Sequence, residues 1–310
     1  MNDTHTTLAD GRRLQYLDLG DPTGHPLFFF HGAPASRLNV AMLDAPLAAA
    51  GIRVIAPDRP GYGGSSLQPK RTLAKWPADV AELADALGID EFVVAGHSSG
   101  GPYAIVCAAT LTNRAHTLLV MSGVTDMGWP QAWQGFVESE QGVMRMTDLE
   151  AAVELCSRRF GADGSTFLGA GFQLPVADQA LFADPNAATA VMQNLAEAFK
   201  QGIRGYVQDV LIQGKAWTFD PSRIVCRTHI VHGEGDTLVP VAHSRHTADV
   251  IPGATFRLVP GHGHLTIVTE LPALASALLG DHAPAESGAE YTNPAFKASS
   301  TAPSRPYTSR

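Results

Sequence analysis

The sequence predicts an α/β fold in which a mostly parallel sheet is flanked by helices and interrupted by an inserted helical block. Over most of the 310 residues, apolar runs of strand length alternate with stretches of helical periodicity, as they do around a parallel sheet. Only helical stretches occur from about residue 127 to residue 216. We therefore expect residues 1–126 and 217–280 to form one α/β core, and residues 127–216 to form a helical subdomain.

The first part of the chain supplies strands and helices in alternation, with Gly and Pro at their ends. In the helix expected over residues 77–87, Pro77 suits the first turn and Gly88 ends the helix. Val80 and Leu87 then lie on one apolar face. On the same grounds we expect strands over residues 13–19, 27–30, 52–56, 92–95 and 117–121, and further helices over residues 38–50 and 101–111.

The later segments are expected to be helical at first and then to return to the alternating pattern. The capping box of Thr147 and Glu150 predicts the start of a helix that ends at Phe160, and Asp184 followed by Pro185 opens another. Residues 281–310 are rich in Ala, Ser, Thr and Pro with balanced charge, which predicts a disordered tail. Strands are expected again over residues 227–231 and 255–259, and helices over residues 241–250 and 265–279.

Composition and charge exclude several classes of protein. Hydrophobic residues make up 45% of the chain and charged residues 17%, so a sizeable core is expected and overall disorder is excluded. The net charge of −8 has the wrong sign for neutralising phosphates, so no nucleic acid partner is expected. No apolar run approaches the roughly 18 residues of a membrane span, and residues 1–13 lack the pattern of a secretory signal. We expect a cytoplasmic protein of undetermined oligomeric state.

The cysteines, a group of glycines and a pair of histidines could each suggest a metal or cofactor site, but none of them has the required pattern. The glycines of residues 61–64 are not followed by the Gly-Lys-Ser/Thr of a phosphate loop. His243 and His246 share a helical face, which we expect to be solvated rather than to hold a metal. The cysteines are odd in number and widely spaced, which fits neither disulfides nor a zinc site. We expect them to be reduced, buried packing residues: Cys107, Cys156 and Cys226.

One junction between a strand and a turn has the pattern of a nucleophile elbow. The strand over residues 92–95 runs into Gly96-His97-Ser98-Ser99-Gly100, which a buried helix follows. A strand that reverses into a helix within a few residues needs small neighbours around Ser98, whose hydroxyl then points out of the turn. The spacing Gly, Ser, Gly alone arises by chance in about one chain in ten of this length. The motif therefore predicts a nucleophile only together with its surrounding sequence.

That context resembles the α/β-hydrolase superfamily, in its cap-bearing branch, over about residues 7–280. The resembling segments occur in the family's order, each at the end of a predicted strand. They are His31-Gly32-Ala33-Pro34, Asp58-Arg59-Pro60-Gly61-Tyr62-Gly63-Gly64-Ser65, the serine elbow, His232-Gly233-Glu234-Gly235-Asp236 and Gly261-His262-Gly263-His264. The resemblance implies an eight-stranded, mostly parallel sheet with a helical cap at residues 127–216.

The resemblance also implies the residues of a catalytic site. Ser98 corresponds to the nucleophile, Asp236 to the acid after the seventh strand, and His264 to the base after the last strand. A serine hydroxyl needs such a base near neutral pH, and the acid orients the imidazole and stabilises its charged form. The backbone N–H groups of Ala33 and Ser99 correspond to the oxyanion hole, which stabilises the tetrahedral intermediate.

Four other residues compete for these roles or lie beside them in the sequence. His262 is the alternative base, but the family's Gly-His followed by an apolar residue matches His264 better. Asp126, at the end of the preceding predicted strand, is the alternative acid. His31 and His97 are expected to support the catalytic loops through hydrogen bonds rather than to take part in the reaction.

The inserted block is rich in large apolar side chains. Most are expected to pack the block's own core, and the remainder to roof an apolar pocket above the serine. They predict an apolar acyl or alkyl group in the substrate. The residues in question are Trp129, Trp133, Phe136, Met144, Met146, Phe160, Phe167, Phe172, Phe182, Met192, Phe199, Tyr206 and Trp217.

We therefore expect a serine hydrolase, similar to carboxylesterases, that cleaves an ester of a small to medium, largely apolar substrate and needs no cofactor. Serine at the elbow argues against the dehalogenases and epoxide hydrolases of this branch, which use aspartate there. Proline iminopeptidases carry His-Gly-Gly-Pro-Gly where this chain has His31-Gly32-Ala33-Pro34-Ala35, so amide cleavage is less favoured. The alternatives are a C–C bond hydrolase, a lyase or cofactor-free oxygenase, and a ligand-binding relative with an inactive triad.

Overall fold

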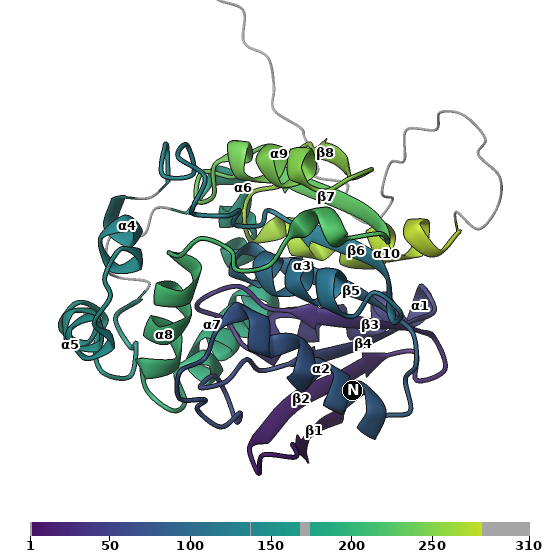
Figure 1. Ribbon diagram of the computed structural model, residues 1–310, viewed down its shortest axis with the longest axis horizontal. Coiled ribbons are helices and arrows are strands. Elements are labelled where there is room, and N and C mark those ends of the chain that lie inside the picture. The colour runs from purple at the N-terminus through teal and green to yellow at the C-terminus, as the bar shows by residue number, and fades with distance from the viewer. Residues whose placement is uncertain (1, 137, 168–173, 281–310) are drawn as a thin grey trace, which may run out of the picture.

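Figure 1 presents a computed structural model of the chain, which describes residues 2–136, 138–167 and 174–280. Within these residues one eight-stranded sheet has the order β1-β2-β4-β3-β5-β6-β7-β8. β2 is antiparallel to its neighbours β1 and β4, and the remaining pairs are parallel. The strands are β1 (Asn2–Thr7), β2 (Arg13–Gly20), β3 (His25–Phe30), β4 (Ile52–Pro57), β5 (Phe92–His97), β6 (Ala115–Met121), β7 (Arg227–Gly233) and β8 (Thr255–Val259).

The order of the parallel strands reverses beside β3. The chain passes from β3 to β4 on one side and then crosses back to β5 on the other side of β3. In an open α/β sheet, the loops that leave neighbouring strands at such a reversal diverge and leave a crevice at their carboxyl ends. The loops after β3 and β5 are therefore where the topology places a binding site.

Helices cover both faces of the sheet. The apolar cluster on one face includes side chains of α2 (Trp76–Ala86) and α3 (Gly101–Thr110), and the cluster on the other face includes side chains of α1 (Asp44–Ala49) and α10 (Leu271–Gly280). α9 (Val241–Val250) packs against β7 and β8. No helix in the described ranges has both the length and the apolar character that crossing a membrane requires.

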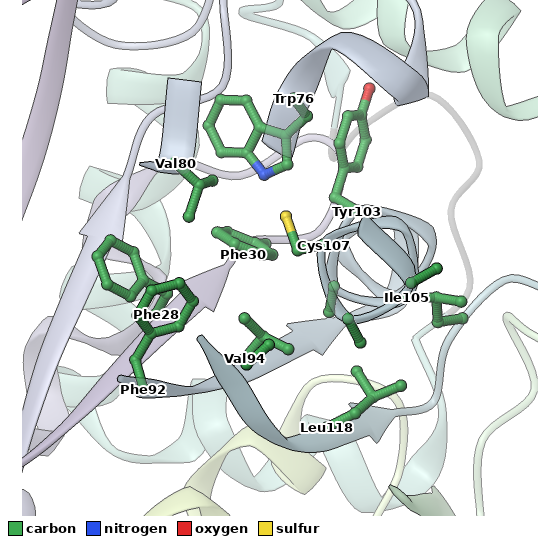
Figure 2. Close-up of a cluster of buried hydrophobic side chains, with 14 of the residues drawn as sticks. Phe28, Phe30, Trp76, Val80, Phe92, Val94, Tyr103, Ile105, Cys107 and Leu118 are labelled. Carbon is green, nitrogen blue, oxygen red and sulfur yellow. The ribbon is translucent and has the colours of Figure 1, made fainter. Parts of the chain in front are cut away.

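The two faces have separate cores because side chains alternate along each strand. On β3, Phe28 and Phe30 are buried on the side of α2 and α3, where Phe30 meets the ring of Trp76 edge to face (Figure 2). Leu27 and Phe29 are buried on the opposite side. A strand covered on both faces has to be apolar throughout, which explains the run of four apolar residues at the end of β3.

The chain between β6 and β7 forms the helices that lie to the left of the sheet and across its carboxyl edge in Figure 1. Their apolar side chains make a third cluster, which also contains Tyr62, Val124 and Val239 from the loops after β4, β6 and β7. The helices therefore rest on the edge where the site is expected. They are α4 (Glu138–Met144), α5 (Leu149–Phe160), α6 (Val176–Ala183), α7 (Pro185–Ala198) and α8 (Arg204–Gln213).

Most predicted strands and helices are confirmed to within a few residues, but three segments differ. β1 was not expected, since its polar sequence pairs only as an exposed edge strand. The predicted helices over residues 38–50 and 265–279 each divide into a 3₁₀ helix and an α-helix. In both cases the α-helix begins just before a proline, Pro46 or Pro272, which is tolerated only in a first turn because it lacks an N–H group.

Smaller expectations were also corrected. α5 begins after Asp148 rather than Thr147, because the Asp148 carboxylate accepts hydrogen bonds from the amides of Glu150 and Ala151. Cys226 is half-buried, whereas the other two cysteines are buried as expected. The predicted tail at residues 281–310 and Phe172 lie outside the described residues.

Candidate active site

Ser98 occupies the sharp turn between β5 and α3. Its φ of 54° lies in the left-handed region, which a residue with a side chain enters only under strain. The turn is tight enough to require glycine at two places. A Cβ on Gly96 would lie 2.3 Å from the Gly100 oxygen, and a Cβ on Gly100 would lie 2.0 Å from the Phe30 oxygen. The predicted elbow is therefore present, and its glycines allow the close approach of three backbone segments.

The three residues expected to carry the chemistry form one hydrogen-bonded chain. His264 Nε2 lies 2.9 Å from Ser98 Oγ, and His264 Nδ1 lies 2.7 Å from Asp236 Oδ2. An ionised carboxylate is only an acceptor, so Nδ1–H donates to Asp236. Nε2 is then left with a lone pair that accepts the Ser98 hydroxyl proton. This is the arrangement in which a histidine can act as a base toward a serine.

Asp236 is held in its place by the turn after β7. One of its oxygens accepts hydrogen bonds from the amides of Leu238 and Val239, at 2.8 and 3.0 Å, and His232 lies 3.5 Å from the other. Burial alone would raise the pKa of Asp236, but the attraction of His264 and these hydrogen bonds outweigh burial and lower it. The carboxyl group is therefore ionised at neutral pH and available to His264.

His264 is almost fully buried, and two opposing effects determine its pKa. Burial disfavours its charged form, but the neighbouring Asp236 carboxylate favours that form more strongly. The net result is a pKa of His264 above the ordinary 6.5. The site thus makes the imidazole a better proton acceptor than a free histidine, as a general base requires.

Hydrogen bonds from two sides hold the loop that carries His264. His97, beside the serine, donates from Nε2 to the carbonyl oxygen of His264 at 2.7 Å. Asp178 of α6 accepts hydrogen bonds from the amide and hydroxyl groups of Thr266, both at 2.8 Å. Burial lowers the pKa of His97 to about 3, so the ring that supports the loop is neutral near neutral pH. This is the hydrogen-bonding role that the sequence suggested for His97.

The segment after β3 brings Ala33 to the same place. Ala33 and Ser99 both line the cavity that contains Ser98, and the Ala33 amide donates no hydrogen bond to any other described residue. The loop is supported by His31, whose Nε2 accepts from the Arg59 amide at 3.2 Å and whose Nδ1 lies 2.7 Å from the Gly32 oxygen. The structure thus places Ala33 and Ser99 in the wall of the same cavity as the serine.

A cavity of about 150 Å³ opens above the serine, comparable in size to a cavity that holds benzene. Most of its wall is apolar, and much of it comes from the helices between β6 and β7. Within the described residues no Asp, Glu, Lys or Arg lines it. The apolar lining from the inserted block consists of Phe136, Met144, Phe167, Leu174, Val191, Leu195, Tyr206 and Val210.

The residues considered as alternatives lie elsewhere. His262 points to Glu270, at 3.3 Å, and its Nδ1 donates to the Thr266 oxygen. Asp126 accepts hydrogen bonds from backbone amides, among them the Trp217 amide at 2.9 Å. The prediction of a solvated face for His243 was wrong, because this ring is buried and both of its nitrogens are hydrogen-bonded, to the Thr125 amide and the Ala132 oxygen.

Sequence reasoning missed three buried polar residues that belong to the surroundings of the site. Asp178 supports the His264 loop, Asp209 binds Arg59 behind the Ala33 loop, and Gln213 lines the cavity. All three lie on helices of the inserted block. Their common signal is a polar residue at a buried position of a helix, as in the series Tyr206, Val210 and Gln213 on one face of α8.

Comparisons with known proteins agree with this fold. The model of the alpha/beta hydrolase fold family matches residues 25–271. The chain is 29% identical over 276 residues to a non-heme haloperoxidase of Rhodococcus erythropolis, covering 84% of this chain and 93% of that protein. It is 28% identical over 273 residues to a 2-hydroxymuconate semialdehyde hydrolase of Pseudomonas putida, covering 84% and 86%.

Solved structures agree as well. A hydrolase from Pseudomonas aeruginosa PA01 superposes with a TM-score of 0.63 at 25% identity, covering 90% of this chain and 97% of that one. An esterase from Exiguobacterium antarcticum superposes with a TM-score of 0.66 at 19% identity, covering 90% and 99%, a likeness of fold alone. Since the family model spans most of the sequence and the sheet has the same architecture, the chain belongs to the alpha/beta hydrolase fold family.

Proposed function

We propose that the protein is a serine hydrolase that cleaves an ester of a small to medium, largely apolar substrate through an acyl-enzyme. The observation that carries this proposal is the chain of hydrogen bonds from Ser98 through His264 to Asp236, at the wall of an apolar cavity. A strained serine, a base of raised pKa and a buried carboxylate are the parts that acyl transfer needs.

In the first half of the reaction, Ser98 Oγ attacks the ester carbonyl carbon while its proton passes to His264 Nε2. The carbonyl oxygen becomes an oxyanion, which the amides of Ala33 and Ser99 stabilise. When the intermediate collapses, the bond to the alcohol oxygen breaks and the proton on His264 goes to the leaving alcohol. An acyl group remains on Ser98, and Asp236 balances the charge that His264 carries between the two proton transfers.

In the second half, a water molecule replaces the alcohol. His264 takes a proton from the water as its oxygen attacks the acyl carbon, and the same two amides hold the second oxyanion. The bond to Ser98 Oγ then breaks, and the proton on His264 returns to that oxygen. The products are a carboxylic acid and the free serine, so the cycle needs no cofactor.

The apolar lining supports an apolar acyl or alkyl group in the substrate. The cavity has no charged side chain of Asp, Glu, Lys or Arg within the described residues, so a charged substrate would lose its hydration without gaining a partner. Because helices of residues 127–216 supply much of the wall, we assign that block as a cap over a core of residues 1–126 and 217–280. Ligand sites commonly lie between two such units.

Labelling with a fluorophosphonate tests this proposal directly. We expect the reagent to modify Ser98, as mapped by peptide mass spectrometry, and Ser98→Ala to prevent the modification. His264→Gln should slow labelling greatly, because it removes the base. The matched control is His262→Gln, which changes a histidine of the same loop that does not contact Ser98. Labelling at another residue, or equal effects of the two histidine variants, would contradict the proposed mechanism.

Turnover then distinguishes ester cleavage from its alternatives. Purified protein should hydrolyse neutral aryl esters of short acyl chains and release one acid and one alcohol per turnover. Charged esters of similar size should react much more slowly, because the cavity offers them no countercharge. Labelling of Ser98 without hydrolysis of any ester would point to another reaction of the same serine.

A further inference from the structure

The carboxamide of Gln213 is a polar group without a partner in the wall of the catalytic cavity. Gln213 is the last residue of α8 and only 4% exposed, and it lines the cavity that contains Ser98. Its Nε2 is buried, and its amide forms no hydrogen bond with any residue that the structure describes. Buried polar groups in folded proteins are nearly always paired, so this one needs an explanation.

The backbone around Gln213 fixes where its side chain starts. α8 also presents Val210 and Tyr206 to the cavity, one and two turns before Gln213. The helix ends tightly, since the Gly214 amide donates to the Val210 oxygen and a Cβ on Gly214 would lie 1.9 Å from the Met144 oxygen. The position of Gln213 is thus determined by packing that does not involve its amide, and the amide is left free for a molecule in the cavity.

A second polar group points to the same conclusion. The Oδ1 atom of Asn39, on the core side of the cavity, is also buried without a partner among the described residues. Asn39 lines both the catalytic cavity and a smaller one next to it. The third carboxamide of the wall, Asn194, accepts hydrogen bonds from Ser36. The other two each leave a buried atom unpaired in a mostly apolar wall, which buried polar groups rarely do. They mark positions where a ligand offers hydrogen bonds.

We propose that Gln213 is a specificity-determining residue that binds an uncharged oxygen substituent of the substrate, a hydroxyl or keto group apart from the ester itself. This inference rests on the proposed function and names the substrate class of that site. A neutral group is required because no Asp, Glu, Lys or Arg lines the described cavity wall. The Nε2–H group of Gln213 is a donor, and an oxygen substituent of the substrate would accept its hydrogen bond.

The energetic consequence is discrimination between similar esters. A site that holds a polar group ready for a substrate oxygen rejects an analogue without it, because the protein group then stays buried and unpaired. A methyl group in place of the hydroxyl has similar size but cannot accept a hydrogen bond. The enzyme should therefore prefer a hydroxy ester over the methyl ester of the same shape.

The test measures kcat/KM for pairs of esters that carry a hydroxyl or a methyl group at the same carbon, with the substituent moved along the acyl chain and then along the alcohol. We expect at least one hydroxy ester to be preferred by about tenfold or more over its methyl partner. In Gln213→Met this preference should be lost while the methyl ester is still hydrolysed. Gln208→Met is the matched control, since the Gln208 amide binds the Gln68 oxygen outside the cavity, and it should keep the preference.

Thermal stability supplies an independent readout. If the Gln213 amide has no partner within the protein, Gln213→Met removes an unpaired buried group. The Tm of this variant should then be equal to or higher than that of the parent protein. A fall of several degrees would mean that the amide has a structural partner, which would overturn the proposal. Gln213→Glu keeps the shape but replaces the donor by an acceptor, so it should lose any preference for a keto ester, whose oxygen can only accept a hydrogen bond.

The outcomes separate the two proposals. Hydrolysis of the methyl and hydroxy esters at equal rates, at every position, would overturn the role of Gln213 and leave the hydrolase function intact. A preference that survives in Gln213→Met would also overturn it. Failure to hydrolyse any ester, together with no labelling of Ser98, would overturn the proposed function itself and the inference with it.

Discussion

The buried side chain of Arg59 donates a hydrogen bond of 3.0 Å to the carbonyl oxygen of Gly32, the residue just before Ala33. It also donates to the carbonyl oxygen of His31. Arg59 is held in turn by Asp209 of α8, at 2.6 Å. A residue of the inserted block thus fixes the peptide that precedes the proposed oxyanion donor, so the block and the site are connected through one buried network.

The first prediction concerns the stability of this network. Asp209 is fully buried and accepts hydrogen bonds from Arg59, Arg71, Tyr62 and Tyr103. Asp209→Ala leaves two buried guanidinium groups without a countercharge, which should lower the free energy of unfolding by about 3 to 5 kcal/mol. Urea unfolding followed by circular dichroism measures the loss.

The control for Asp209 is an ion pair at the surface. Glu154 pairs with Arg158 one turn further along α5, and both side chains are largely exposed. Glu154→Ala should leave the unfolding midpoint unchanged within error, because water screens such pairs. If Asp209→Ala were equally harmless, the buried network would not be what holds the Ala33 loop in place.

The second prediction concerns the pH dependence of the reaction. His264 must be neutral to accept the Ser98 proton, so kcat/KM should rise with pH and level off above the pKa of His264. Burial lowers that pKa, but Asp236 outweighs burial and raises it above 6.5, so the rise should be centred above pH 6.5. Asp236→Asn removes the charge and the correct tautomer. It should lower kcat/KM by roughly 10³- to 10⁴-fold and move the rise to lower pH.

The direction of the pH shift is the decisive part of this measurement. A variant that merely damages the fold lowers the rate at every pH without moving the profile. Asp126→Asn serves as the comparison, because Asp126 binds backbone amides and not His264, and it should keep the position of the rise. A profile of Asp236→Asn that rises at the same pH as the parent protein would contradict the assigned role of Asp236.

The order of the candidate catalytic residues along the chain could be predicted from the sequence, whereas the residues that hold them in place could not. Ser98, Asp236 and His264 were assigned by a resemblance whose motifs follow the predicted strands β5, β7 and β8, and the carboxyl ends of parallel strands lie at one edge of the sheet. Asp178 and Gln213 lie on helices of the block, where only the three-dimensional packing decides which polar residue faces the core. Local periodicity carries no information about contacts between segments far apart in the sequence, such as the 88-residue separation between Asp178 and Thr266.

The third prediction tests the tightness of the elbow. A Cβ on Gly100 would lie 2.0 Å from the Phe30 oxygen and 2.7 Å from the His31 oxygen. Backbone atoms of a central strand cannot move aside, so Gly100→Ala should cost about 1 to 3 kcal/mol or more of stability and displace Ser98. Labelling by the fluorophosphonate should slow sharply. Gly142→Ala, in α4, is the comparison, since nothing lies within 4 Å of a Cβ there.

The two glycine variants should therefore change stability in opposite directions. Gly142 is a helical residue, and alanine at such a position favours the helix by roughly 0.5 to 1 kcal/mol. Thermal unfolding of both variants, alongside their rates of labelling, makes the comparison. If Gly100→Ala kept full stability and labelling, the close approach of the strand and the elbow would not matter for the site.

The last prediction follows from histidines that are buried in the neutral form. Burial lowers the pKa of His243 to about 4 and that of His97 to about 3, whereas the unfolded chain has the ordinary value of about 6.5. Between these values the unfolded state binds more protons than the folded state, so stability falls as the pH falls from 6.5 toward 4. Each such histidine contributes up to about 1.4 kcal/mol per pH unit to this slope.

His243→Gln isolates one of these contributions, because glutamine can accept from the Thr125 amide and donate to the Ala132 oxygen as His243 does without titrating. The free energy of unfolding, measured in urea between pH 6.5 and 4, should decline less steeply in this variant by about 1.4 kcal/mol per pH unit. His262 is the opposite case, since its hydrogen bond to Glu270 raises its pKa above 6.5. Its stabilising effect is complete below pH 6.5 and is lost only as the pH rises, so His262→Gln should leave the acid slope unchanged. Equal slopes for the parent protein and His243→Gln would mean that His243 is charged within the folded protein, against the burial and hydrogen bonding that the structure gives it.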